Sequence, residues 1–161
     1  MAKFAIYAFI SSGNVSFAQN TFDYVLKRAS DCQRAARCEE ARKLLAGAFA
    51  QAGKNPGVAG TILNNLGSVY QDMGDLREAE RCYRRAVEMI ESTSGPESIE
   101  LARPLNNLGS IYLEQGKYSK SIGIRRRSLA IREKACGPDD PEVAAVLRNL
   151  AVAYLARGTF A

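Results

Sequence analysis

The sequence predicts an all-α fold in which helix pairs repeat along the chain, and three observations support this prediction. A short block recurs every 42 residues, as NNLGSVY at 64–70, NNLGSIY at 106–112 and RNLAVAY at 148–154. Residues 64–105 and 106–147 are identical at 15 of 42 positions. Apolar residues within each unit follow the three- and four-residue spacing of a helix face. A fixed period of this length is the signature of a repeat array, in which neighbouring units cover one another.

Two helices are expected in the first full unit, at 58–73 and 76–92. Gly74 should end the first helix, because glycine readily adopts the left-handed conformation that follows a helix. Asp75 can cap the second helix. A Gly-Pro pair at 95–96 then stops the second helix and opens the loop to the next unit.

The second unit repeats this plan, with helices expected at 98–115 and 118–135 and Gly116 between them. A Gly-Pro pair again follows, and the third unit has a single helix at 141–157. Pro104 lies inside the expected first helix of the second unit. Because proline lacks an N–H group and clashes with the preceding turn, it should kink this helix or delay its start.

The regions upstream and downstream of the full units are less regular. Residues 21–33 and 36–52 are predicted to form a degenerate earlier helix pair. The last helix lacks the second helix of its unit, so we expect it to expose apolar surface. This favours self-association through that helix, and it also favours a chain that is a fragment of a longer array. The predicted regions are 1–20 (signal peptide or irregular tail), 21–57 (degenerate helix pair) and 58–161 (repeats at 58–99, 100–141 and an incomplete 142–161).

The N-terminus leaves the compartment open. Lys3 precedes an apolar run at 4–10, and the small residues Ser16 and Ala18 suit a signal peptide cut after Ala18. The alternative is an irregular N-terminal tail, and a cytoplasmic location is slightly favoured over export. No stretch approaches the roughly 20 apolar residues of a membrane-spanning helix.

Composition excludes several kinds of catalytic and metal site. The chain has 161 residues, a net charge of +5, and no histidine or tryptophan. It therefore has no Ser-His or Cys-His nucleophile pair and no imidazole metal ligand. Phosphate-loop and nucleophile-elbow motifs are absent too. We expect no enzyme activity, no cofactor and no metal. The four cysteines fit no zinc or redox spacing and are interpreted as apolar core residues on helices, with their redox state open: Cys32, Cys38, Cys82 and Cys136.

The two full units resemble the tetratricopeptide repeat, in the 42-residue variety typified by kinesin light chain. The residues that carry the resemblance are LNNLGSVYQDMGDLREAERCYRRAVEMIESTSGPESIELA and LNNLGSIYLEQGKYSKSIGIRRRSLAIREKACGPDDPEVA. It covers 58–161 strongly and 21–57 weakly. The resemblance implies a right-handed superhelix of antiparallel helix pairs (an α-solenoid) that binds other proteins. Ser121, Arg125 and Ser128 stand where the family pattern has Ala, Tyr and Ala, so we expect looser packing in the second unit.

The resemblance also places the first helix of each unit along a concave groove. Asn65, Asn107 and Asn149 recur there once per unit, and an asparagine amide can both donate to and accept from a peptide backbone. The alternative is that these asparagines bond neighbouring helices and serve the fold. The candidate groove residues are Asn64, Asn65, Ser68, Asp72, Arg103, Asn106, Asn107, Ser110, Glu114, Arg148 and Asn149.

Basic residues gather on the second helices, which the resemblance places on the convex side. Arg125, Arg126 and Arg127 form the strongest cluster, with Arg132 and Lys134 nearby. We interpret this cluster as a solvent-exposed face without a ligand. The alternative is a functional surface that contacts phosphate or anionic lipid. Aromatic residues do not alternate with these charges, so nucleic acid is not an expected partner.

The sequence as a whole predicts a protein–protein interaction module that binds a peptide or partner segment in the concave groove. The alternative is a regulatory or structural repeat segment of a larger multidomain protein from a bacterium.

Overall fold

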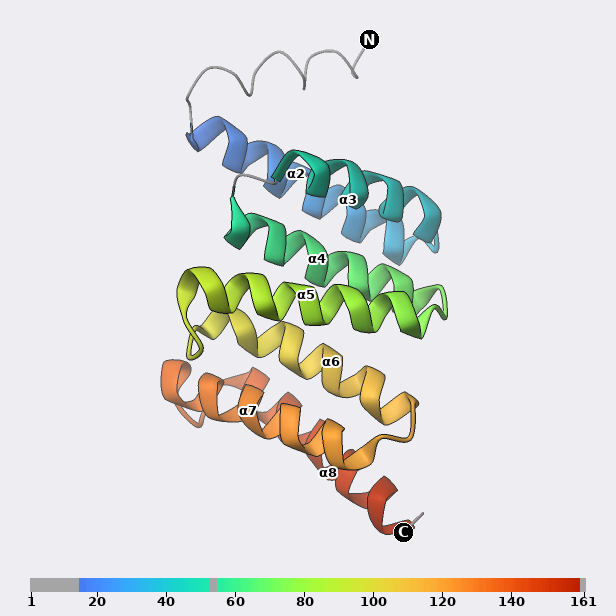
Figure 1. Cartoon of the computed structure of the whole chain (residues 1–161), viewed down its shortest axis with the longest axis vertical. Helices are drawn as coiled ribbons and strands as arrows, with labels where there is room; N and C mark the ends of the chain where they lie inside the picture. Colours follow the sequence, from blue (N-terminus) through green and yellow to red (C-terminus); the bar gives the residue numbers. More distant parts are fainter. Residues whose placement is uncertain (1–14, 53–54, 160–161) are drawn as a thin grey trace.

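The computed structural model describes residues 15–52 and 55–159. This part of the chain contains α-helices and one short 3₁₀ turn but no strand, which confirms the predicted all-α class. The helices stack in layers along one axis, with α2 at one end of the stack and α8 at the other (Figure 1). The elements are α2 (Val15–Arg34), α3 (Cys38–Ala52), α4 (Pro56–Asp72), α5 (Leu76–Ser94), η1 (Ile99–Leu101), α6 (Ala102–Glu114), α7 (Tyr118–Cys136) and α8 (Pro141–Thr159).

The way the helices touch defines an inner and an outer side of the stack. Each helix packs on the next one along the chain. The first helices of successive units, α2, α4, α6 and α8, also touch one another. Within the described residues, the second helices α3, α5 and α7 lie farther apart and meet through long side chains, as where Arg85 of α5 stacks on the Phe49 ring of α3. The stack therefore bends towards the first helices, which line its concave side, and the second helices form the convex side.

The turns inside the units are made by the glycines that the sequence indicated. Gly74 and Gly116 have φ of 78° and 72°, the left-handed conformation that glycine adopts without steric cost. The side chain of Asp75 accepts a hydrogen bond from the Glu78 N–H at 3.1 Å and so caps α5. The turn between α2 and α3 carries Ala36 with a φ of 56°, so the degenerate pair makes its turn without glycine.

Pro104 delays the start of α6 rather than kinking it. The chain first forms the 3₁₀ turn η1, and α6 begins at Ala102, two residues before the proline. Pro104 thus sits in the first turn of the helix, where an N–H group would have no partner within the helix. The expected helix from residue 98 is therefore shorter, and Pro104 itself is almost fully buried.

Small residues on the first helices let the two helices of a unit approach closely. A Cβ atom placed on Gly67 would lie 2.7 Å from the Tyr83 ring, closer than real Cβ contacts allow. The same atom on Gly109 would lie 2.6 Å from the side chain of Arg125. The bulky residue on the second helix therefore occupies the space that the glycine leaves open.

The second unit keeps this packing although its residues are polar. Ser121 and Ser128 are both 0% exposed, so the looser packing expected here is not seen at these positions. Each hydroxyl donates to a backbone carbonyl of α6 at 2.6 Å, Ser121 to Gly109 and Ser128 to Ala102. Both buried hydroxyls are thereby paired, and they join α7 to α6.

The cysteines divide between core and surface. Cys32 and Cys82 are buried, as expected of apolar core residues, and burial raises the pKa of the Cys82 thiol to about 11. Cys38 is partly buried, and Cys136 is exposed at the end of α7, where the expectation of a core position was wrong. All four are free thiols.

At the N-terminal end, α2 begins at Val15, which is six residues before the expected start of the degenerate pair. Ser16 and Ala18, the residues suited to signal-peptide cleavage, lie within this helix. The apolar run at 4–10 lies outside the described residues. Among the helices that the structure describes, none is long and apolar enough to cross a membrane.

Replacing Gly67 with leucine should destabilise the fold, because the new side chain has to displace the Tyr83 ring. We expect a loss of about 3 kcal/mol in the free energy of unfolding, the upper part of the usual range for overpacking. Gly47, in the middle of α3, is the matched control, since a Cβ there meets nothing within 4 Å. Gly47→Leu should leave stability unchanged or raise it by up to about 1 kcal/mol. Denaturant unfolding measures both, and equal effects would contradict the close approach.

Candidate functional site

The candidate groove is lined by α4, α6 and α8, whose equivalent positions recur every 42 residues. Asn65, Asn107 and Asn149 are all partly buried at this surface, one on each helix. A second row runs from Ser68 through Ser110 to Val152, and it changes from polar to apolar along the array. The three helices thus present related rows of side chains to the concave side.

The asparagines form a ladder between units. Asn107 Nδ2 donates to Asn64 Oδ1 at 3.1 Å, and Asn149 Nδ2 donates to Asn106 Oδ1 at 3.3 Å. The second asparagine of one unit therefore bonds the first position of the unit before it. Asn65 instead donates to the Thr61 carbonyl within its own helix at 2.9 Å. The sequence left open the alternative that the asparagines bond neighbouring helices, and Asn107 and Asn149 do form such bonds.

These bonds leave part of each amide available. Asn64 is only 6% exposed, so its side chain acts inside the array rather than at the groove surface. An asparagine amide carries two N–H donors and one carbonyl oxygen. The bonds of Asn107 and Asn149 described above use one N–H each. The remaining N–H and the carbonyl oxygen can face a ligand, held in place by the neighbouring unit.

At one end of the groove, amide side chains already hold the acidic residues. Gln33 Nε2, from α2, donates to Asp72 Oδ2 at 2.6 Å and to Ser68 Oγ at 3.3 Å. Gln71 Nε2 donates to Glu114 Oε1 in the same way. Gln33 was missed in the sequence because the degenerate helix pair carries no motif that aligns it with the later units.

The basic candidates Arg103 and Arg148 are both exposed, on α6 and α8. Neither forms an ion pair with an acidic residue in the described part of the chain. Since they are two single charges on different helices, they provide no set of converging donors for a carboxylate.

Arg125 lies beneath the groove rather than on the convex surface where its sequence context placed it. It is 2% exposed, and burial lowers the pKa of its guanidinium. One Nη donates to the Asn149 carbonyl at 2.7 Å and the other to Ser110 Oγ at 2.9 Å, while Nε has no partner. Arg125 thus occupies the place that Tyr83 holds in the first unit and connects α7 to both α6 and α8.

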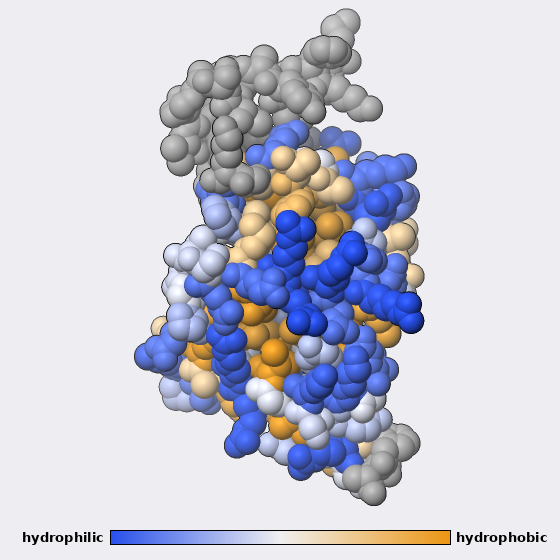
Figure 2. All heavy atoms as spheres, in the orientation of Figure 1, coloured by the Kyte–Doolittle hydropathy of each residue, from blue (hydrophilic) through white to orange (hydrophobic). Residues whose placement is uncertain are grey.

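Three further basic residues of this cluster have acidic partners, whereas the exposed Arg126 forms no ion pair in the described part of the chain. Arg127 bonds Glu91 and the Pro96 carbonyl, and Lys134 bonds Glu97. Arg132 lies 3.5 Å from Asp140. The expected patch around 125–134 is therefore largely neutralised, and hydrophilic side chains cover this face with apolar surface between them (Figure 2).

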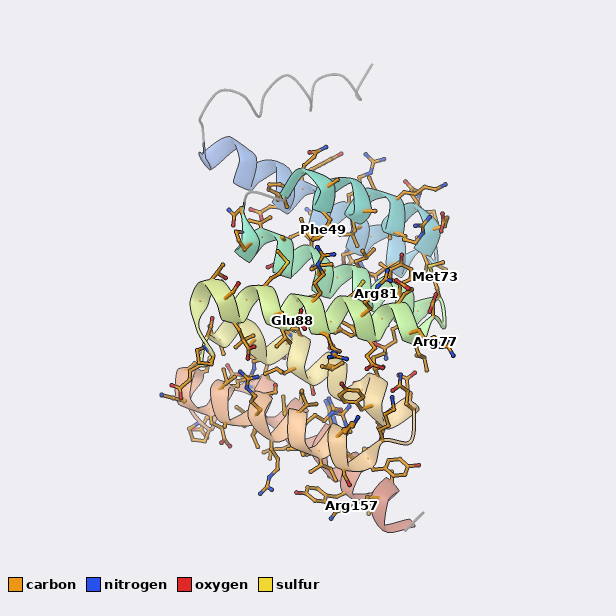
Figure 3. The ribbon with its side chains drawn as sticks, viewed as in Figure 1. Phe49, Met73, Arg77, Arg81, Glu88 and Arg157 are labelled. Atoms are coloured by element: carbon orange, nitrogen blue, oxygen red, sulfur yellow. The ribbon has the colours of Figure 1, made fainter. Side chains whose placement is uncertain are left out.

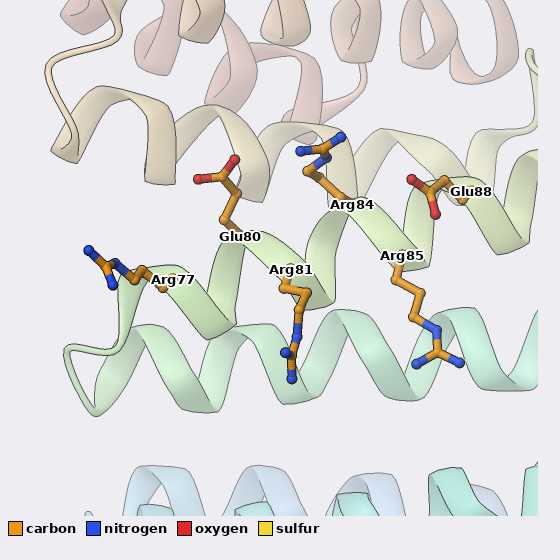
Figure 4. A pocket seen from close by; sticks show the side chains of 6 residues that line it. All are labelled: Arg77, Glu80, Arg81, Arg84, Arg85 and Glu88. Carbon is orange, nitrogen blue, oxygen red and sulfur yellow. The ribbon is translucent and has the colours of Figure 1, made fainter.

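A shallow hollow of about 460 Å³ lies on the outer face of α5 (Figure 4). It contains both signs of charge, and Arg77, Arg81 and Glu88 project from this side of the stack (Figure 3). Arg81 pairs with Glu78 at 2.6 Å, and Arg85 stacks over the Phe49 ring at 5.0 Å. The lining residues are Arg77, Glu80, Arg81, Arg84, Arg85 and Glu88. In the described chain, no three Cys, Asp or Glu side chains gather as metal ligands would.

A double-mutant cycle tests the ladder. Asn64→Ala and Asn107→Ala remove the two ends of one hydrogen bond, so their effects on stability should not add. We expect a coupling energy of about 0.5–1.5 kcal/mol, the usual net worth of such a bond. The control cycle pairs Asn64→Ala with Asn149→Ala, which do not bond each other, and should give a value near zero. Equal coupling in both cycles would contradict the ladder.

Substitutions of Arg125 test its role as a space-filling residue. Arg125→Ala should cost about 2–4 kcal/mol of unfolding free energy, because it leaves a cavity beside Gly109 and removes donors from two acceptors. Arg125→Tyr should stay within about 1 kcal/mol of the native chain, since Tyr83 fills the equivalent space. Thermal and denaturant unfolding compare the two. A tyrosine variant as unstable as the alanine variant would show that the two positions are not equivalent.

Comparison with known proteins agrees with this geometry. BtubC (BKLC) from P. vanneervenii has a similar structure, with a TM-score of 0.76 and 26% identity over 89% of this chain. The kinesin light chain TPR-like repeats of Podosopora anserina share the fold, with a TM-score of 0.77 and 22% identity over 86% of this chain. This chain spans 59% of the BtubC chain and 67% of the Podosopora chain. No curated protein matches the sequence significantly.

The family assignment comes from the sequence itself. The family model described as "Tetratricopeptide repeat" matches residues 58–134 and 100–161, which together are more than half of the chain. With its solenoid of helix pairs and its kinesin-light-chain-like neighbours, the protein belongs to the tetratricopeptide repeat family.

Proposed function

We propose that the chain holds an extended or helical segment of a partner protein in the concave groove of α4, α6 and α8. Tetratricopeptide repeats generally mediate protein–protein interaction, and they typically serve as scaffolds without enzymatic activity. The observation that carries the proposal is the asparagine ladder. Asn107 and Asn149 each bond the unit before them, and each retains an N–H and a carbonyl oxygen that these bonds do not use.

In this proposal the asparagines bind the ligand backbone, and the other rows bind its side chains. Backbone contacts give affinity with little dependence on ligand sequence, as in other modes of peptide recognition. Asn65, Asn107 and Asn149 are spaced by one unit each, which suits a ligand that runs across the helices. Contacts with the ligand's side chains are proposed for Ser68, Asp72, Arg103, Ser110, Glu114 and Arg148. Asn64 and Asn106 would hold Asn107 and Asn149 in position through their hydrogen bonds.

A second proposal is that the array is a regulatory or structural segment of a larger protein. The observation in its favour is that the match covers only 59% of the BtubC chain, so the rest of BtubC has no counterpart in the residues compared. In that case the groove would bind a segment of the same protein or of a partner. Neither proposal includes an enzymatic activity, a cofactor or a nucleic-acid ligand.

Peptide selection from a random library provides a ligand for the groove whatever the natural partner is. Asn65 is the most informative residue to substitute, because its hydrogen bond lies within its own helix and removing its side chain leaves the ladder intact. We expect Asn65→Ala to weaken binding of the selected peptide about tenfold, equivalent to about 1.4 kcal/mol. Asn65→Asp removes the N–H donors but keeps the shape, and should weaken binding similarly.

The matched control is Arg77→Ala, on the outer face of α5, which should leave the affinity unchanged. Calorimetry or fluorescence anisotropy measures each affinity, and circular dichroism confirms that each variant is folded. Unchanged binding by both Asn65 variants, or weaker binding by the Arg77 variant, would contradict capture in the groove.

A further inference from the structure

The outer face of α5 and α7 carries four basic side chains that no acidic residue of the described chain neutralises. Arg77 and Arg84 lie on α5, Lys120 and Arg126 lie on α7, and all four are exposed. None of them forms an ion pair within the residues that the structure describes. Lys120 stands over the Tyr112 ring at 6.0 Å, which leaves its charge without a carboxylate partner. These four residues are called the outer basic set.

The repeat places the outer basic set in two rows across α5 and α7. Arg84 and Arg126 are 42 residues apart, so they occupy equivalent positions on the two helices. Lys120 is the equivalent of Glu78, the residue next to Arg77, and these two cations form the other row. The rows lie about 10 Å apart along the helices, because each helical residue advances the chain by about 1.5 Å. The set therefore marks out a compact patch of positive charge that includes both helices.

The carboxylates of this face leave the charge of the outer basic set unbalanced. Glu78 pairs with Arg81 at 2.6 Å, and Glu80 accepts a hydrogen bond of 2.9 Å from the glutamine at the end of α6. Glu88 lies at the far end of the hollow on α5 (Figure 4), and Glu133 lies farther along α7. These two acids mark where the basic area ends. The first two thirds of the face therefore keep an excess of positive charge.

We propose that the outer face of α5 and α7 binds an acidic segment of a partner protein, with a run of about four Asp or Glu residues. In an extended chain three residues cover about 10 Å, which is the distance between the two rows. Side chains of such a segment alternate in direction, so its carboxylates can reach cations on both helices. An arginine guanidinium can bind a carboxylate through two parallel hydrogen bonds, which suits Arg84 and Arg126 at the equivalent positions.

The shape of this face favours a protein segment over a lipid surface. Arg84 lines the hollow of about 460 Å³ on α5, whereas a membrane surface is flat on this scale. Exposed small residues lie beside Arg126 on α7, at Ser119, Gly123 and Ala130, and they leave room for an approaching chain. The large apolar side chains of α5 and α7 are all buried or partly buried, so these two helices offer none for insertion into lipid. The groove lies on the opposite side of the stack, so both surfaces can be occupied at once.

Fluorescence anisotropy with a short labelled peptide tests the proposal. The probe is a Gly/Ser peptide with four central glutamates, and the same peptide with four glutamines is its neutral counterpart. At about 50 mM salt we expect saturable binding of the glutamate peptide alone, weakening as salt is raised to about 300 mM. Because exposed ion pairs are individually weak, Arg84→Gln and Arg126→Gln should each weaken binding about threefold, and together about tenfold.

The matched control is Arg157→Gln, which removes the same charge from an exposed arginine at the far end of the stack (Figure 3) and should leave the affinity unchanged. Equal weakening by all three variants would show attraction to net charge alone and would overturn the proposal. So would the absence of saturable binding up to about 1 mM peptide. Phosphatidylserine vesicles that bind through Arg84 and Arg126, in place of the peptide, would assign the face to a membrane instead.

Competition separates this surface from the groove. A peptide selected for the groove should not displace the glutamate peptide, because the two sites lie on opposite sides of the stack. Displacement would place the acidic segment in the groove and would overturn the proposal. Loss of groove binding in the Asn65 variants would leave binding at the outer face unchanged, so the two proposals stand or fall separately.

Discussion

The close approach of the two helices in each unit is the constraint on which the rest of this structure depends. Gly67 and Gly109 leave no room for a side chain because Tyr83 and Arg125 occupy that space. This contact fixes the distance between first and second helix. Because each unit then stacks on the next with the same geometry, the first helices come into contact with one another on the inner side. The asparagine ladder and the contacts between the first helices on the concave side both follow from that spacing.

The second unit shows how a repeat can change its chemistry while keeping its geometry. Arg125 stands where the first unit has Tyr83; the Tyr83 hydroxyl donates to Gln71 Oε1, whereas the guanidinium of Arg125 reaches Ser110 and the Asn149 carbonyl. The buried serines of α7 donate hydrogen bonds to backbone carbonyls, so burying their hydroxyls leaves no polar group without a partner. Polar residues inside this unit therefore connect three helices. The positive charge of Arg125 lies under the part of the groove where the lining changes from polar to apolar.

Much of the fold could be predicted from the sequence because its signals are local and repeated. Glycines at the turns and the 42-residue period fix where helices end and which positions are equivalent. The site was harder to predict, because residues next to each other in the sequence can point to opposite sides of a helix. Arg125 and Arg126 are adjacent in the sequence, yet the first is buried and the second is exposed. The partner of Asn107 proved to be Asn64, 43 residues away, and a single sequence gives no signal for such a pair. Ala36 likewise adopts a turn conformation that its residue type does not indicate.

The central claim is that the asparagine side chains hold a ligand in the groove, and their own amide signals test it most directly. Each side-chain NH₂ group gives a pair of resonances in a nitrogen–proton correlation spectrum of the labelled chain. On addition of a selected peptide, we predict shifts and slower solvent exchange for Asn65, Asn107 and Asn149, with little change for the buried Asn64. Saturable binding that leaves these signals unmoved, and instead shifts residues along the outer face of α5, would contradict the account.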